Sequence, residues 1–233
     1  MTYNEDEQVE QLKRFWNDYG TGILLAVALG LALFAGWRVW QKGRLDQATI
    51  ATSALQDMNG AMQRLQNDPT DKSSNTDLQK NAQKLLTDYA STPYAINAAL
   101  LLAKHAIQTN DLKEATKQLQ WVLAQKPDEG VRIITTVRLA RVKAASGDNA
   151  GALALLANEN DPSFAPLINE ARGDFDVALG KQDDARTAYQ AADAALLKRD
   201  EPVSPLLEMK MAGVGVTPAE RSQDKPDDKA AAQ

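Results

Sequence analysis

Three stretches of this sequence share one pattern: TNDLKEATKQL at residues 109–119, ASGDNAGALALL at residues 145–156 and ALGKQDDARTAY at residues 178–189. Each has a turn with Gly or Asn, then a polar helix start, then an alanine that opens an apolar face. These alanines, with one earlier position of the same series, are Ala82, Ala115, Ala152 and Ala185. Their spacings of 33, 37 and 33 residues indicate a repeated unit of about 34 residues, long enough for two helices.

Small side chains mark the places where the two helices of each unit would cross. Ala103, Ala140 and Gly173 hold matching positions in the preceding helices, and larger residues follow the key alanines by four positions. Those larger residues are Leu86, Leu119, Leu156 and Tyr189. Only small side chains fit where helix axes approach closely, and larger ones fill the next layer. With Pro127 near the end of its helix, the pattern resembles the tetratricopeptide repeat and predicts an all-α solenoid. An ordinary antiparallel helical bundle is the alternative.

The segments on either side of the repeats are also expected to be helical in part. We predict helices at residues 45–65 and 77–89, separated by a polar break at residues 67–71. A last apolar turn is predicted from Leu206, Leu207, Met209 and Met211. The tetratricopeptide-like domain is therefore assigned to residues 42–213. The polar remainder, residues 214–233, is expected to be a disordered tail because it offers few apolar anchors.

An apolar run before the repeats is long enough to span a membrane. Residues 22–40 are GILLAVALGLALFAGWRVW, in which Arg38 is the only charged residue. A helix over this run is roughly 28 Å long, close to the ~30 Å hydrocarbon core of a bilayer. We predict one transmembrane helix at residues 21–41. Its anchor residues, which include a stripe of small side chains and tryptophans at one interface, are Gly22, Ala28, Ala32, Gly36, Trp37 and Trp40.

Several alternatives remain open for this region. A cleaved signal peptide would have a short basic start and a small residue before its cleavage site, whereas this start is long and acidic and the run ends in LFAG at residues 33–36. Residues 1–20 form either an amphipathic helix on the membrane surface or a solvated helical lead-in. Basic residues before and after the run nearly balance, so charge slightly favours a cytoplasmic C-terminal side and does not settle the topology.

The composition argues against catalysis and against nucleic-acid binding. A net charge of −5 and a pI near 5.0 are unlike a protein that meets phosphates with a basic face. The chain has no cysteine and a single histidine, His105, which cannot by itself make a metal cluster or a catalytic triad. No GxGxxG, Walker A or HExxH motif occurs. We expect a non-enzymatic protein with no metal, no cofactor and no nucleic-acid partner.

Surface recognition is the remaining route to function. The first helices of stacked two-helix repeats line a concave groove. The predicted groove residues are Asn97, Leu101, Lys104, Ile134, Arg138, Arg141, Glu170 and Asp174. Their mixture of basic, acidic and apolar side chains suits an extended peptide or a partner helix. The same charges would also suit a solvated face that binds nothing.

Four segments give the chain a family resemblance. They are YNEDEQVEQLKRFWNDYG at residues 3–20, GWRVWQKG at 36–43, TVRLARVKAASGD at 136–148 and SPLLEMKMAG at 204–213. These segments resemble the YfgM family, the ancillary subunits of the bacterial SecYEG translocon. The resemblance covers nearly the whole chain, from about Tyr3 to Val214, with the tail as an addition.

The resemblance implies a type II protein of the bacterial inner membrane, with residues 1–20 cytoplasmic and the repeats periplasmic. It also implies contacts with the SecYEG channel and with a membrane-anchored periplasmic folding factor of the prolyl-isomerase type, PpiD. Unfolded or nascent envelope proteins and membrane lipid would be the further partners, in a chaperone-network scaffold without catalysis. Two alternatives are a membrane-anchored scaffold for other envelope or cell-division complexes and a tether that faces the cytosol.

Overall fold

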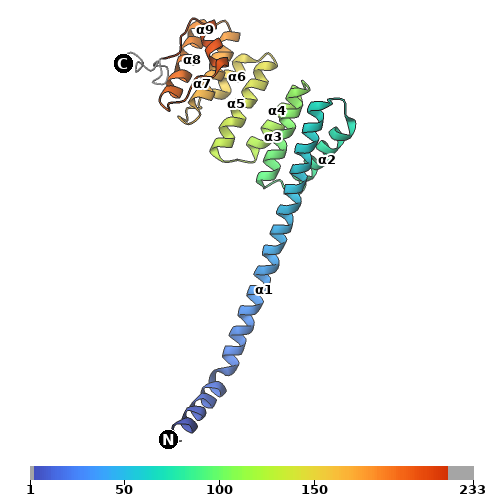
Figure 1. Ribbon diagram of the computed structural model, residues 1–233, viewed down its shortest axis with the longest axis vertical. Helices are drawn as coiled ribbons and strands as arrows, with labels where there is room; N and C mark the ends of the chain where they lie inside the picture. The colour runs from blue at the N-terminus through green and yellow to red at the C-terminus, as the bar shows by residue number, and fades with distance from the viewer. Residues whose placement is uncertain (1–2, 220–233) are drawn as a thin grey trace, which may run out of the picture. The chain divides into compact units, whose positions relative to one another are not determined.

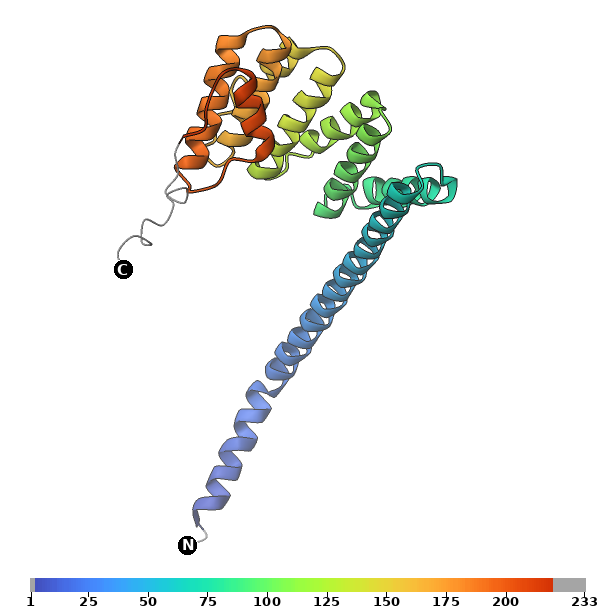
Figure 2. The ribbon, with the colours of Figure 1, turned by 45° about the horizontal axis from the view of Figure 1, so that its top comes forward.

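The computed structural model describes residues 3–219, except for the side chains of residues 3–9, 11–12, 23, 39–40 and 43–46. Within residues 3–219 the chain is all-α, because its elements are helices joined by short turns (Figures 1 and 2). The all-α class expected from the repeats is therefore confirmed. The chain divides into two units, Met1–Ser53 and Ala54–Gln233, which are described separately below.

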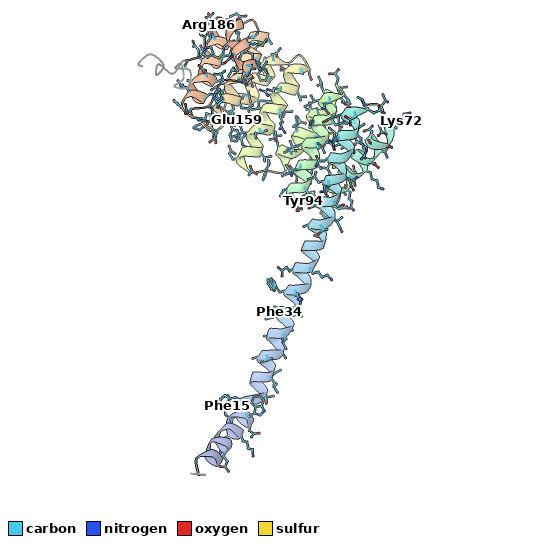
Figure 3. The ribbon with its side chains drawn as sticks, in the orientation of Figure 1. Phe15, Phe34, Lys72, Tyr94, Glu159 and Arg186 are labelled. Atoms are coloured by element: carbon cyan, nitrogen blue, oxygen red, sulfur yellow. The ribbon has the colours of Figure 1, made fainter. Side chains whose placement is uncertain are left out.

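The first unit lies within the long helix α1, Tyr3–Asn67. No proline occurs anywhere in these residues, so nothing in the sequence forces a break between the predicted lead-in, anchor and post-anchor segments. The stretch Lys13–Arg38 is long and apolar enough to cross a membrane. Its large apolar side chains are exposed, as Leu25 and Leu33 are at 68% each, and Phe15 and Phe34 project from the helix in Figure 3. Exposure on this scale is unlike the core helix of a soluble domain.

The second unit begins with the last turns of α1 and with α2, Lys72–Asp88. One face of these α1 turns is buried, through Ala54, Met58, Ala61, Met62 and Leu65. The predicted start of the next helix at residue 77 is wrong, because α2 begins at Lys72. Asp71 is its N-cap, because the Asp71 carboxylate accepts hydrogen bonds from the backbone N–H groups of Ser73 (2.9 Å) and Ser74 (3.2 Å). This cap lets the polar run after it join the helix.

Three antiparallel helix pairs follow and form the body of the repeats (Figures 1 and 2). The pairs are α3 (Pro93–Gln108) with α4 (Leu112–Ala124), α5 (Glu129–Ala145) with α6 (Asn149–Leu156), and α7 (Ala165–Ala178) with α8 (Gln182–Leu197). Each pair turns through one residue of positive φ: Asn110 (59°), Gly147 (92°) and Gly180 (74°). A left-handed residue ends each first helix tightly, which explains the Gly or Asn in every repeat.

The small residues predicted at the helix crossings are buried there. Ala103 packs in one cluster with Leu119, and Ala140 packs in another with Leu156. In the third pair Gly173 replaces the alanine, and the buried ring of Tyr189 on α8 lies against its Cα. The Tyr189 ring thus fills the space that an alanine side chain at position 173 would occupy, which keeps the core close-packed.

The stack ends in a short helix, α9, Pro205–Gly213, capped by Ser204. Two of the four predicted apolar residues, Leu207 and Met211, are buried against α8 and its neighbours, whereas Leu206 and Met209 are exposed at 59% and 73%. Beyond α9 the packed chain continues, since Val214 and Val216 are buried and Ala219 N–H donates to Asp193 (2.8 Å). Packing therefore continues six residues past the predicted end of the domain at residue 213. Of the predicted tail, residues 220–233 lie outside the described part.

Candidate functional site: a groove along the first repeat

A groove of about 700 Å³ runs along α3, between the end of α1 and the start of the second repeat. Its apolar lining consists of Leu55, Leu100, Leu101, Ala103, Ile107 and Leu119. Its polar lining consists of Asn59, Asn97, Lys104, Gln108 and Arg138. An apolar floor with a few polar groups at its margin is the usual construction of a protein site that binds a ligand or a peptide.

Two cations, Lys104 on α3 and Arg138 on α5, stand at the margin of this groove, and Arg141 lies one turn further along α5. All three side chains are exposed. The ion pairs among the described residues involve other cations, so these three have no carboxylate within 4.0 Å. These three cations therefore form no ion pair within the described chain.

The third repeat differs, because its carboxylates are already engaged. Lys210 of α9 inserts its ammonium group between Glu170 (2.6 Å) and Asp174 (2.8 Å) of α7. Asp174 also accepts a hydrogen bond from the Tyr189 hydroxyl at 2.9 Å. Burial acts to lower the pKa of Lys210, but the bonds to Asp174 and Glu170 outweigh it and raise that pKa above its ordinary value. The acidic pair thus holds α9 in place.

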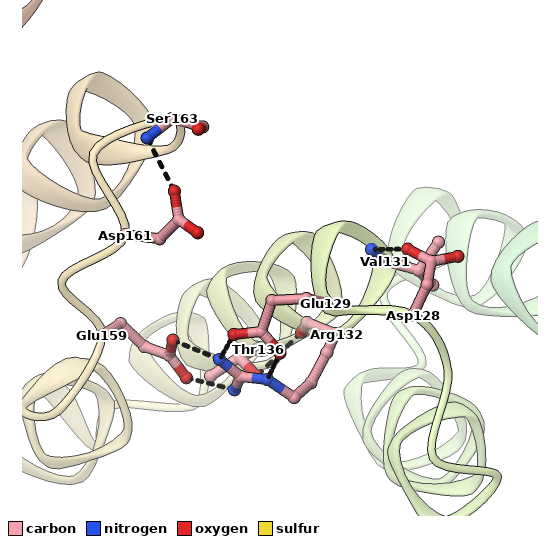
Figure 4. A network of polar contacts seen from close by, with 8 residues as sticks. All are labelled: Asp128, Glu129, Val131, Arg132, Thr136, Glu159, Asp161 and Ser163. Carbon is pink, nitrogen blue, oxygen red and sulfur yellow. Dashed lines mark hydrogen bonds and ion pairs between the residues drawn. The ribbon is translucent and has the colours of Figure 1, made fainter.

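A second polar network fixes the connection between the second and third repeats (Figure 4). The helix α6 is only eight residues long, and the loop after it turns back toward α5. There the buried Glu159 accepts two hydrogen bonds from the Arg132 guanidinium, one of them 2.7 Å long, and Arg132 also bonds Glu129. Arg172 donates to the backbone carbonyls of Leu156 and Glu159 at 2.7 Å each. Arg172 thereby satisfies backbone carbonyls that the end of the short helix leaves open, and Arg132 pairs with the buried Glu159 carboxylate.

The eight predicted groove residues fall into three groups in the structure. Asn97, Leu101, Lys104 and Arg138 line the groove together. Ile134 and Arg141 lie on α5 outside that lining, half-buried and exposed respectively. Glu170 and Asp174 bond to Lys210. Whether any of the eight contacts a partner stays a prediction.

Sequence reasoning missed one wall of the groove, which comes from Leu55 and Asn59 of α1. Both precede the repeats, so the repeat period gave no position for them. The signal that could have placed them is the helical spacing of apolar residues at 54, 58, 61, 62 and 65, which fixes the buried face of α1 and hence its margin.

The predicted anchor residues lie on the apolar part of α1. Gly22, Ala28, Ala32 and Gly36 are exposed, and a Cβ atom at Gly22 or Gly36 would meet no atom within 4 Å. Trp37 is 54% exposed and its ring lies 6.2 Å from that of Phe34. The side chain of Trp40 lies outside the described part of the structure. These exposed positions are available to lipid or to a second helix.

The chain matches the model of the tetratricopeptide repeat-like domain over residues 13–216. This chain belongs to that family. The tetratricopeptide repeat-like match begins at the first residue of the apolar stretch Lys13–Arg38 and runs through α9. It therefore covers the apolar helix as well as the repeats.

Four curated relatives of the chain share one name, ancillary SecYEG translocon subunit. The chain is 30% identical over 188 residues to the protein of that name from Escherichia coli (strain K12), a match covering 81% of this chain and 86% of the relative. It is 28% identical to the one from Haemophilus influenzae (82% and 91% covered) and 25% identical to the one from Neisseria gonorrhoeae (89% and 95% covered). The resemblance to the family of ancillary translocon subunits is thus confirmed. No solved structure matches the chain significantly.

Proposed function

We propose that this protein is a non-enzymatic, ancillary subunit of the SecYEG translocon, held in the inner membrane by α1. The observation that carries the proposal is the extent of the similarity. Relatives named for this role match the chain over more than four fifths of its length, and the family match includes both the apolar helix and the repeats. An apolar helix suits contact with a membrane channel, and a repeat groove suits contact with other proteins.

The proposed topology is type II, with the N-terminus cytoplasmic and the repeats periplasmic. There they would bind a PpiD-type folding factor and assist newly translocated envelope proteins as a chaperone-network scaffold. The family resemblance supports this orientation, whereas the basic residues around α1 are nearly balanced. The natural chain has no cysteine, so single-cysteine variants report topology without background. Lys113→Cys should react with a membrane-impermeant maleimide from the periplasmic side, and labelling only after membrane disruption would reject type II.

The proposal includes a non-catalytic role, in keeping with the repeat fold and with relatives named as ancillary subunits. Within the described residues no group of three or more His, Asp or Glu is arranged to hold a metal ion. The single histidine, His105, is half-buried on α3, and burial lowers the pKa of its imidazole. A scaffold predicts that His105→Gln leaves partner capture intact.

Photocrosslinking in living cells tests the proposal. A photoreactive residue at Ala32 would probe the apolar helix, and one at Arg138 or Arg141 would probe the groove side of the repeats. We expect capture of SecY from the helix and of a PpiD-type factor or of translocating chains from the repeats. A probe at Lys84, an exposed α2 residue outside the groove lining, is the matched control. Capture of cell-division or cell-wall proteins without any translocon component would instead support a scaffold of other envelope complexes.

A further inference from the structure

The groove along α3 combines an apolar floor with cations that form no ion pair with any described residue. Leu100 and Leu101 are half-buried in its wall and Ile107 is 44% exposed, so three large apolar side chains remain accessible. Lys104 and Arg138 stand beside them. Covering these apolar groups would release their hydration water, which favours binding of an apolar side chain in the groove.

The chain as a whole is acidic, with a net charge of −5. The acidic residues of the predicted concave face, Glu170 and Asp174, share one ammonium group, that of Lys210. Lys104, Arg138 and Arg141 have no such counter-charge within the described residues. Within the described residues no carboxylate pairs with these three cations, so a ligand that carries carboxylates would complement them.

We infer that the groove binds an extended, unfolded polypeptide segment in which apolar side chains are interspersed with Asp or Glu. The inference rests on the proposed function only in taking the groove as a surface for protein partners, and it deepens that function by naming the class of segment recognised. The apolar side chains fill the floor along α3. The carboxylates face Lys104, Arg138 and Arg141.

The spacing of the cations favours side-chain carboxylates over a chain terminus. Lys104 and Arg138 belong to different helices, and Arg141 lies three residues beyond Arg138 on α5. Residues three apart on a helix are neighbours on one face, about 5–6 Å between Cβ atoms. The cations are thus spread over two helices, whereas a single C-terminus offers one carboxylate. Several cations are better matched by acidic side chains along an extended strand, whose same-face residues recur every ~6.6 Å.

Binding of labelled peptides to the full-length protein in detergent micelles tests the inference by fluorescence anisotropy. The probe is a C-terminally amidated peptide of leucines interspersed with glutamates. Comparison peptides replace Glu by Gln, Glu by Lys, or Leu by Ser. We expect the Glu peptide to bind at least about tenfold more tightly than each comparison peptide. We also expect its affinity to fall with added salt, since the charged groups are exposed.

Two double variants of the protein test whether the peptide binds at this groove. Arg138→Glu combined with Arg141→Glu should weaken the Glu peptide by at least about tenfold and strengthen the Lys peptide. Lys84→Glu combined with Lys113→Glu makes the same change in net charge on exposed positions outside the groove lining and should leave both affinities unchanged. Arg138 and Arg141 make no ion pair in the described structure, so their replacement should leave the helical circular dichroism intact.

The outcomes separate the inference from the proposed function. Equal binding of the Glu and Lys peptides, or equal weakening by both double variants, overturns the inference. A peptide that binds only with a free C-terminal carboxylate, or binding only to anionic vesicles, also overturns it, because the site then recognises a chain end or lipid headgroups. None of these results would contradict the proposed function, which the photocrosslinks to the translocon test separately. Loss of the translocon crosslinks with retention of groove-dependent peptide binding would reject the proposed function and leave the inference standing.

Discussion

A Cβ atom added at Gly173 would lie 2.4 Å from Cε1 of Tyr189, because the tyrosine ring packs directly on the glycine backbone. The ring cannot move aside easily, since Tyr189 is 2% exposed and its hydroxyl is bonded to Asp174. At the corresponding crossings of the first two pairs, an alanine packs with a leucine: Ala103 with Leu119 and Ala140 with Leu156. In the third pair, glycine stands in place of the alanine and tyrosine in place of the leucine.

Gly173→Ala should therefore destabilise the repeats. Alanine gains about 1 kcal/mol in helix propensity, but overpacking a filled core costs roughly 1–3 kcal/mol, so we expect a net loss. Thermal unfolding followed by circular dichroism measures it. Gly60→Ala is the control, because its nearest atom would be 3.6 Å away, and it should be neutral or stabilising. In a Tyr189→Leu background the loss at position 173 should shrink; a loss of equal size in both backgrounds would contradict this account of the crossing.

Arg132→Ala should loosen the connection between the second and third repeats. It leaves the carboxylate of Glu159, whose side chain is only 10% exposed, without its cation. An unpaired buried charge is costly, and because Arg132 itself is partly exposed we expect a loss of about 1–3 kcal/mol. Urea unfolding is the measurement.

The companion variant Glu129→Ala removes the exposed partner of the same arginine. It should reduce stability less than Arg132→Ala does, because surface ion pairs contribute little. Equal losses of stability for the two variants would show that the bond to Glu159 is not the one through which Arg132 stabilises the protein.

Lys210→Met should release α9 from the end of the stack. It removes the cation between Glu170 and Asp174 and leaves two partly buried carboxylates side by side. Amide hydrogen exchange should accelerate across residues 205–216 and much less in α3 and α4, because the stack opens locally at its end. Adding Glu170→Gln and Asp174→Asn to Lys210→Met removes the repulsion and should restore much of the protection. Uniform acceleration over all repeats would mean that α9 supports the whole stack.

The sequence predicts most of the repeat architecture, because its signals are local. The turn residues Asn110, Gly147 and Gly180 and the small residues at the crossings each express a steric requirement within one helix pair. The groove could be predicted only in part. Asn97, Leu101, Lys104 and Arg138 follow from the repeat register, but Leu55 belongs to a helix outside the period.

The engagement of the α7 carboxylates could not be predicted from the period either. Lys210 is 40 residues from Glu170 and 36 from Asp174, and α9 has no second helix to place it in a repeat register. The start of α2 differs from its prediction for another reason. The run KSSNT at residues 72–76 has poor intrinsic helix propensity, yet the Asp71 cap stabilises a helix over it.

His105 should make the stability of the protein fall as the solution becomes mildly acidic. Burial lowers the pKa of its imidazole below the ordinary 6.5, so the unfolded chain takes up a proton more readily than the folded one. The stabilisation is thus complete above the unfolded pKa and is lost as the pH falls from about 6.5 toward the folded pKa. Because His105 is the only histidine, the thermal midpoint of His105→Gln should change less between about pH 7.5 and 5.5 than that of the natural chain. Other groups, such as Asp176, whose pKa is raised by burial and by Asp184, titrate in both proteins and cancel in the comparison. Parallel pH profiles for the two proteins would show that the imidazole is as well solvated in the folded state as in the unfolded chain.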